Sequence, residues 1–212
     1  KEGINNMELE EMLKIFDYMN IQIENINGKY IEEKHGNGEN YYRLELLENS
    51  WNFVFVQKEK MNKYDIQKEF MTRREAIKYF CFYELRDMYS NKYLDKIIEN
   101  NDLIGTDGFE IADLLNIFHT LCIDDKVYTV VGKKNKAVNL VKTSDDMYVV
   151  AYINEIGTVI HKTIELDKNT ALYAMFRWTY LLSLMNTHIT KLSSIGALTE
   201  EVGDNEYKIL FS

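Results

Sequence analysis

Proline is absent from the 212 residues, and the chain holds only two cysteines and four histidines. Without proline there is no proline-rich linker and no cis-proline turn. Small secreted domains are rich in disulfides, so two cysteines favour a reducing compartment. Together with the many Asn and Lys residues, this predicts a bacterial cytoplasmic protein. The chain begins with Lys1 rather than Met, which leaves open a signal or an anchor before it.

Basic charge and long apolar runs are also scarce. The chain carries 25 Lys and Arg against 34 Asp and Glu, a net charge of −9. A general nucleic-acid binder needs a basic surface to neutralise phosphates, so this class is disfavoured. No run approaches the 18 apolar residues of a membrane-spanning helix, and we expect no membrane insertion. Hydrophobic residues make up 46% of the chain, which is enough for a folded core.

The chain does contain a repeated order of patterns. Residues 10–19 align with 112–121 at an offset of 102, residues 51–56 with 147–152 at an offset of 96, and residues 72–77 with 167–172 at an offset of 95. Sequence identity is low, and any two stretches that mix helices and strands can be slid into register. We interpret the shared order as two copies of one unit, residues 1–104 and 105–212.

Each copy predicts a helix, four short strands and a second helix. The first helices are expected at 7–20 and, with Asp107 as N-cap, at 108–122. Turn-like links join the strands, which predicts antiparallel hairpins at 29–34, 40–48, 51–57 and 63–70, and again at 127–132, 136–143, 146–153 and 157–166. The closing helices begin at the capping box Thr72–Glu75 and at Asp167. The predicted fold class is α+β, with helices packed on one face of antiparallel sheet and a short edge strand at 207–211.

The histidines and cysteines, which often act in catalysis, are not spaced as in a known catalytic or metal-binding motif. No two of His35, His119, His161 and His188 have a metal-ligand spacing, and neither cysteine lies in a zinc motif. Cys81 is surrounded by aromatic residues, which predicts a buried, unreactive thiol. Turns and links explain the remaining glycine, acidic and basic clusters, at 105–108, 124–125 and 133–136. We therefore expect no catalytic residue, no metal site and no cofactor.

Two surface features favour a binding function. Acidic charge is spread over both copies: 15 basic and 20 acidic residues in 1–106 give −5, and 10 and 14 in 107–212 give −4. This suits a basic partner, although solubility alone also explains it. Alternation along 51–56 places Trp51, Phe53 and Phe55 on one sheet face. The opposite face carries interface-type side chains, unless a second layer covers them: Tyr41, Arg43 and Glu45, and in the second copy Tyr148 and Tyr152.

This pattern resembles the immunity proteins of bacterial polymorphic-toxin systems. The resemblance lies in the size and acidity of the chain, in the sheet cores Trp51–Val56 and Tyr148–Ile153, and in the helices after Thr72 and Asp167. It implies an inhibitor that binds a cognate, basic toxin or nuclease domain and occludes its active site. No diagnostic motif assigns the contacts, so the charge and the exposed faces nominate them: Glu8, Glu11, Tyr41, Arg43, Glu45, Asp145, Asp146, Tyr148 and Tyr152.

Two other functions remain open at this point. A phage-type inhibitor of a defence nuclease would use carboxylates spaced like phosphates to mimic nucleic acid. A small-molecule enzyme would bring His119 or His161 together with acids between the two copies, in a deep pocket that shifts the pKa of the histidine.

Overall fold

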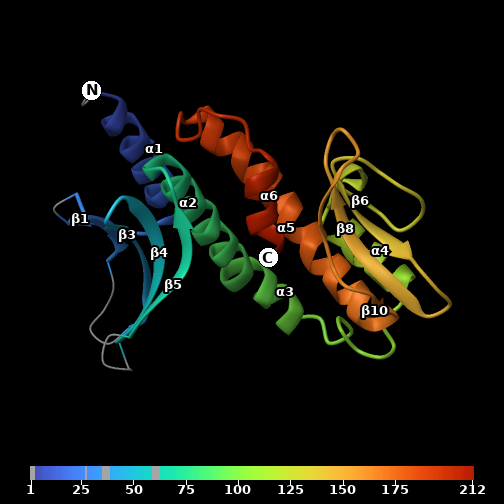
Figure 1. The fold of residues 1–212 in the computed structure, drawn as a ribbon. Coiled ribbons are helices and arrows are strands. Elements are labelled where there is room, and N and C mark those ends of the chain that lie inside the picture. Colours follow the sequence, from blue (N-terminus) through green and yellow to red (C-terminus); the bar gives the residue numbers. More distant parts are fainter. Residues whose placement is uncertain (1–2, 27, 35–38, 59–62) are drawn as a thin grey trace. The chain divides into compact units, whose positions relative to one another are not determined.

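A computed structural model describes residues 3–26, 28–34, 39–58 and 63–212, without the side chains of residues 3–8 and 26 (Figure 1). Internal contacts divide the chain into two compact units. The first comprises Lys1–Leu85 and Thr190–Glu201, and the second comprises Arg86–Ile189 and Val202–Ser212. This division differs from the expected 1–104 and 105–212, because residues 86–104 join the second unit and residues 190–201 join the first.

The first unit has the predicted order of helix, antiparallel sheet and helix. Its elements are α1 (Gly3–Met19), β1 (Ile23–Ile26), β2 (Tyr30–Glu33), β3 (Tyr41–Leu47), β4 (Ser50–Gln57), β5 (Lys63–Phe70) and α2 (Arg73–Tyr89). Neighbouring strands pair in the order β1-β2-β3-β4-β5, and every pair is antiparallel. The α+β fold class is thus confirmed. The sheet has five strands rather than the expected four, because Ile23–Ile26 pairs with β2.

Aromatic side chains join this sheet to its helices. The Phe53 ring on β4 lies 5.6 Å from Phe80 and 4.9 Å from Tyr83, both on α2, and Phe80 lies 5.1 Å from Phe16 on α1. Figure 1 shows α1 and α2 on the same side of the sheet. The predicted cap at Thr72 is also present, since its Oγ1 accepts a hydrogen bond from the Glu75 backbone N–H at 3.2 Å.

The second unit repeats this order with shorter strands and additional helices. It begins with the last turn of α2 and continues through a π-helical turn (Ser90–Leu94), α3 (Asp95–Glu99), α4 (Ile111–Thr120), a 3₁₀ turn (Asp125–Val127), β6 (Tyr128–Thr129), β7 (Ala137–Lys142), β8 (Met147–Ile153), β9 (Val159–Lys162), β10 (Leu166–Asp167), most of α5 (Lys168–Ser194) and α6 (Asp204–Phe211). β8 is central, with antiparallel β7, β9 and β10 as partners.

Several boundaries in the second unit differ from expectation. β6 pairs with β7 in parallel, not as a hairpin. The bridge covers two residues of each strand, and the wide loop 130–136 brings the chain back in the same direction. The strand expected at 157–166 is two short strands, β9 and β10. α4 is capped by Glu110 through a capping box with Asp113, not by Asp107.

The C-terminal edge strand expected at 207–211 is wrong, because this segment forms α6. Glu206 Oε2 accepts from the Gly203 backbone N–H at 2.7 Å, and Asp204 accepts from Asn154 Nδ2 at 3.0 Å. The buried residues Glu206, Ile209 and Leu210 have helical spacing, and this places them on one side of the helix.

A loop covers part of the second sheet. The side chain of Asn139 on β7 is buried, and its Oδ1 accepts from the Lys134 backbone N–H at 2.8 Å. Its Nδ2 donates to the carbonyls of Lys134 and Ala137, at 3.0 and 2.8 Å. Asn139 thereby replaces backbone pairing for the loop 130–136 and holds it on the sheet. None of the described helices combines the length and apolarity needed to cross a membrane.

Candidate partner-binding surface

The face of the first sheet that points away from α1 and α2 is built by cross-strand register. Paired residues of neighbouring strands point to the same side. One row therefore joins Tyr41, Val56 and Tyr64. The next joins Glu32, Arg43, Val54 and Ile66, and a third joins Tyr30, Glu45 and Asn52. We call the surface formed by Tyr30, Glu32, Tyr41, Arg43, Glu45, Tyr64 and Ile66 the Arg43 face.

Arg43 organises this surface. Its Nη2 donates to Glu45 Oε2 at 2.7 Å, and its Nη1 lies 4.0 Å from Glu32 Oε2. The guanidinium carbon lies 4.7 Å from the centre of the Tyr30 ring and 4.9 Å from that of Tyr64. Two carboxylates and two aromatic rings therefore fix one side chain, so little conformational entropy remains for a partner to remove.

The electrostatics follow from this packing. Burial alone lowers the pKa of Arg43, but the hydrogen bond and the charge of Glu45 outweigh it and raise that pKa above its ordinary value. Burial, followed by the charge of Glu32, raises the pKa of the Tyr41 phenol. The guanidinium is thus a permanent cation, and the phenol remains a neutral hydrogen-bonding group.

Exposed apolar and acidic side chains surround the arginine. Tyr64 is 53% exposed and Ile66 is 58% exposed. Register also places the exposed Glu24 and Glu69 on this side, opposite Glu32 and Asn52. With Glu32 and Glu45, four carboxylates share the face with the Arg43 guanidinium. An aromatic and aliphatic centre with an acidic edge is the composition expected of a surface that docks a basic protein.

Three of the predicted contact residues, Tyr41, Arg43 and Glu45, lie together on this face. Tyr41, however, is only 8% exposed and packs in a buried cluster with Val54 and Val56, so its ring is not the open contact that was predicted. Glu11 does not, because it lies on α1, where it accepts a hydrogen bond from the Thr199 hydroxyl. The side chain of Glu8 lies outside the described residues. Asp145 and Asp146 are exposed in the turn between β7 and β8 of the second unit.

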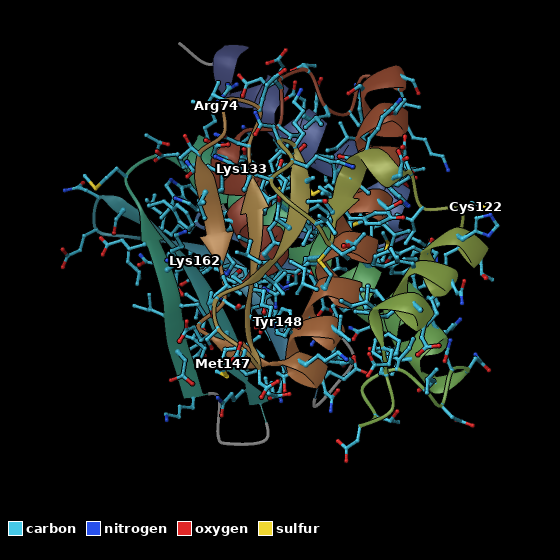
Figure 2. All side chains as sticks on the ribbon, turned by 90° about the vertical axis from the view of Figure 1, so that its right-hand side faces the viewer. Arg74, Cys122, Lys133, Met147, Tyr148 and Lys162 are labelled. Carbon is cyan, nitrogen blue, oxygen red and sulfur yellow. The ribbon has the colours of Figure 1, made fainter. Side chains whose placement is uncertain are left out.

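The two tyrosines of the second copy occupy a different environment from the one predicted. Tyr152 is only 3% exposed, and its ring lies 4.9 Å from Tyr207 and 5.1 Å from Phe211, both on α6. Tyr148, labelled on β8 in Figure 2, shares this helix-facing side by strand alternation. A partner cannot reach the Tyr152 ring. The offset of 96 pairs residues that face the helices in the first sheet with residues that face away from them in the second. The predicted alignment of the two copies is therefore wrong by one residue at these strands.

Four residues of the Arg43 face were missed in the sequence, namely Tyr30, Glu32, Tyr64 and Ile66. Period-two alternation marks Tyr64 and Ile66 as sharing a face of β5, but a bulge at Phe53/Val54 changes the register between β4 and β5. Tyr30 and Glu32 could be assigned only with the register of β2 against β3. The alternation of side chains shows which residues of one strand point to the same face. Only the register between strands shows which residues of neighbouring strands lie next to one another on that face.

None of the described histidines considered for catalysis belongs to the Arg43 face. His188 is buried, with its ring 5.0 Å from that of Tyr89. His161 lies 5.2 Å from Trp178, and burial lowers its pKa. His119 is exposed on α4, and His35 lies outside the described residues.

The two cysteines lie in different environments. Cys81 is buried as predicted, and burial raises the pKa of its thiol. Cys122 is exposed with a φ of 53°, beyond the end of α4 rather than within a helix (Figure 2). Among the described residues, no cluster of three or more His, Cys, Asp or Glu could hold a metal ion.

No family model matches the chain, and comparison with curated proteins and with solved structures finds no match.

Proposed function

We propose that this chain binds a basic protein through the Arg43 face and neutralises it, in the manner of an immunity protein that occludes the active site of a toxin or nuclease domain. The observation that supports this most directly is the cluster itself. Its arginine is held by two rings and two carboxylates, next to exposed Tyr64 and Ile66. Without a partner, exposing these two side chains to water brings no benefit to folding.

Aromatic and aliphatic anchors would supply most of the affinity. Tyr64 and Ile66 are neighbours on β5, two residues apart on one side of the strand. Burying such side chains fully in an interface contributes about 1.5–3 kcal/mol each. The rigid arginine beneath Tyr64 keeps that ring in position before binding, which lowers the entropic cost of association.

Carboxylates at the edge of the face would act mainly on the rate of encounter. Glu24 and Glu69 are exposed, so their attraction to a basic partner is screened by salt. Such residues change association rates and salt dependence more than dissociation rates. Variants of the central residues should therefore change mainly the dissociation rate, and variants of the edge residues mainly the association rate.

The test uses the product of the neighbouring open reading frame, expressed as its variable C-terminal domain and captured on the full chain. We expect Ile66→Asp to weaken binding at least 100-fold and Tyr64→Ala at least 10-fold, mainly through faster dissociation. Ile156→Asp is the matched control, because Ile156 is 83% exposed in a turn of the second unit. Loss of binding in the control alone, with full binding by both face variants, would overturn the proposal.

A second comparison tests the edge. The double charge reversal Glu24→Lys with Glu69→Lys is expected to slow association and to flatten its dependence on salt. The same reversal at Asp145 and Asp146 is the counterpart, and we expect it to leave both quantities unchanged. The opposite result would move the interface to the β7–β8 turn. Binding to a nuclease that DNA displaces competitively would instead favour the nucleic-acid mimic.

A further inference from the structure

We propose that the second unit binds a small organic anion with a planar apolar body, such as an aromatic carboxylate or phosphate ester. The site is a pocket of about 280 Å³ between α5, α6 and the end of α2. Its volume is close to the lower end of the range for ligand pockets in proteins. It lies within one unit and shares no residue with the Arg43 face.

One part of the pocket wall is apolar, and the rest is polar. Leu181 on α5 and Leu210 and Phe211 on α6 line it and are buried. Trp178 lies against them, with its ring 5.0 Å from that of Phe211. A flat hydrocarbon or aromatic group would replace water at this surface, which is favourable by roughly 25 cal/mol per Å² of apolar area removed from water.

A tyrosine forms another wall. Tyr173 lines the pocket, and its ring packs against the backbone of Gly105. A Cβ built on Gly105 would lie 3.4 Å from this ring, and the φ of this glycine is +84°. Few other residues adopt that conformation, so glycine allows the loop to support the ring closely. Gly105, which the sequence indicates as a linker, thus also positions a wall of the pocket.

Positive charge is concentrated at this site in a chain whose net charge is −9. Arg86 and Arg177 both line the pocket, and none of the described side chains lining it is acidic. Arg86 Nη1 donates to Ser212 Oγ at 3.4 Å. The neighbouring Asp87 accepts a hydrogen bond from Asn91 Nδ2 at 2.8 Å and does not line the pocket. Two guanidinium groups with the hydroxyl of Ser90 suit a carboxylate or phosphate head, whereas the Thr170 hydroxyl already donates to Asp167 Oδ2 at 2.6 Å.

The backbone next to the pocket supplies an independent indication. The π-helical turn Ser90–Leu94 begins at a residue that lines the pocket. A π-helical turn widens the helix at the cost of regular hydrogen bonding, and such turns often occur at functional sites. Here the irregular turn adjoins the cationic, aromatic pocket. This combination points to a ligand rather than to incidental packing.

Fluorescence gives a direct readout, because the chain has two tryptophans and Trp178 lines the pocket. In the full chain carrying Trp51→Phe, emission reports Trp178. Phenyl phosphate is the probe, with inorganic phosphate and phenol as the separate anionic and aromatic parts. We expect saturable quenching by phenyl phosphate with a dissociation constant below 1 mM, a value that corresponds to about 4 kcal/mol of binding energy. The separate parts should bind at least 10-fold more weakly.

Variants test the role of each arginine. Arg177→Gln and Arg86→Gln are each expected to weaken phenyl phosphate binding at least 10-fold. Lys162→Gln is the matched control, because Lys162 is exposed on β9 of the same unit and does not line the pocket (Figure 2). Circular dichroism verifies that each variant is folded, and Arg177→Lys tests whether the fork of the guanidinium is needed in addition to charge.

The outcomes decide the proposal. No saturable change up to 10 mM phenyl phosphate would overturn it, as would equal affinity for phenol, since charge would then have no role. Equal weakening by Lys162→Gln would show that general electrostatic attraction, not the pocket, accounts for the signal. Because the pocket and the Arg43 face share no residues, this result is independent of toxin binding.

Discussion

The two sheets are built from the same order of elements, yet they present different second faces. In both units one face packs on helices, through Phe53 and Phe80 in the first and through Tyr152 and Phe211 in the second. The other face of the first sheet carries the Arg43 cluster with exposed Tyr64 and Ile66. In the second sheet, the buried Asn139 holds the loop 130–136 on the corresponding face.

The difference shows how one arrangement of elements serves two purposes. Where its own loop covers the second sheet, polar groups are satisfied internally and add to stability, although Val141 on the same side is 40% exposed. A face that carries an ordered charge cluster and exposed apolar side chains, such as Tyr64 and Ile66, leaves these groups available to contact another molecule. The first unit is therefore proposed to provide the protein contact. The second unit holds the pocket between α5 and α6 that is proposed to bind an anion.

Replacing one buried asparagine in each sheet, Asn139 in the second and Asn52 in the first, should give the largest difference in stability between the two sheets. Asn139→Ala removes three hydrogen bonds of 2.8–3.0 Å and leaves backbone groups of the loop without their partner. We expect it to lower the free energy of unfolding by about 2–3 kcal/mol. Asn52→Ala removes only two long contacts to Ser50, at 3.4 and 3.5 Å, and should cost about 1 kcal/mol. Urea unfolding measures both.

Limited proteolysis provides the control for this pair. If Asn139 holds the loop, Asn139→Ala should expose new cleavage sites within residues 130–136, and Asn52→Ala should not affect that loop. Equal stability losses in the two variants would mean that the second face of the two sheets is stabilised in the same way. That result would remove the distinction between a covered and an exposed face.

The helix caps allow a smaller and more closely matched comparison. Thr72 caps α2, and Asp167, its counterpart in the repeat, caps α5 by accepting from the Thr170 backbone N–H at 3.0 Å. Thr72→Ala is expected to cost about 1 kcal/mol. Asp167→Ala should also destabilise. The second effect should depend on pH more strongly, because there the capping group itself is a carboxylate, whereas the Thr72 hydroxyl does not titrate in this range.

The direction of that pH dependence follows from the pKa of Asp167. A hydrogen bond from the Thr170 hydroxyl, and a second from its backbone N–H, lower this pKa in the folded state. The carboxylate therefore contributes stability above its unfolded pKa of about 3.9, and this is lost as the pH falls through the lower folded value. Unfolding at pH 7 and pH 3 should show the Asp167→Ala deficit shrinking and the Thr72→Ala deficit persisting. A constant deficit at Asp167 would contradict the assigned role of its charge.

Local patterns predicted much of the fold. The capping box at Thr72 and the alternation along 51–57 indicate a helix start and a strand, and both are confirmed by α2 and β4. These features depend on hydrogen bonds or side-chain directions within a few residues of chain. The same patterns brought Tyr41 and Arg43 onto one surface.

Other features required information from distant parts of the chain. α6 was mistaken for a strand because its apolar residues follow one another in sequence, while their burial depends on packing against Tyr152. The parallel pairing of β6 with β7 depends on the loop that Asn139 holds. Tyr30 and Tyr64, on β2 and β5, belong to one cluster because each ring lies near the Arg43 guanidinium. Such contacts are set by register and tertiary packing.

The smallest expected effect concerns His161, which belongs to the covered second sheet. Burial against Trp178, followed by the charge of Lys208, lowers its pKa in the folded state. As the pH falls below about 6.5, the unfolded chain takes up the proton first, so stability decreases until the folded pKa is passed. The ring is partly exposed and solvent screens its charge, so the loss should stay below about 1 kcal/mol. Urea unfolding from pH 7.5 to 5 should show this loss in the wild type and in Lys162→Gln, and a flatter profile in His161→Gln. An unchanged profile in His161→Gln would mean that other groups cause the loss, and the pH response would then not distinguish the second sheet from the first.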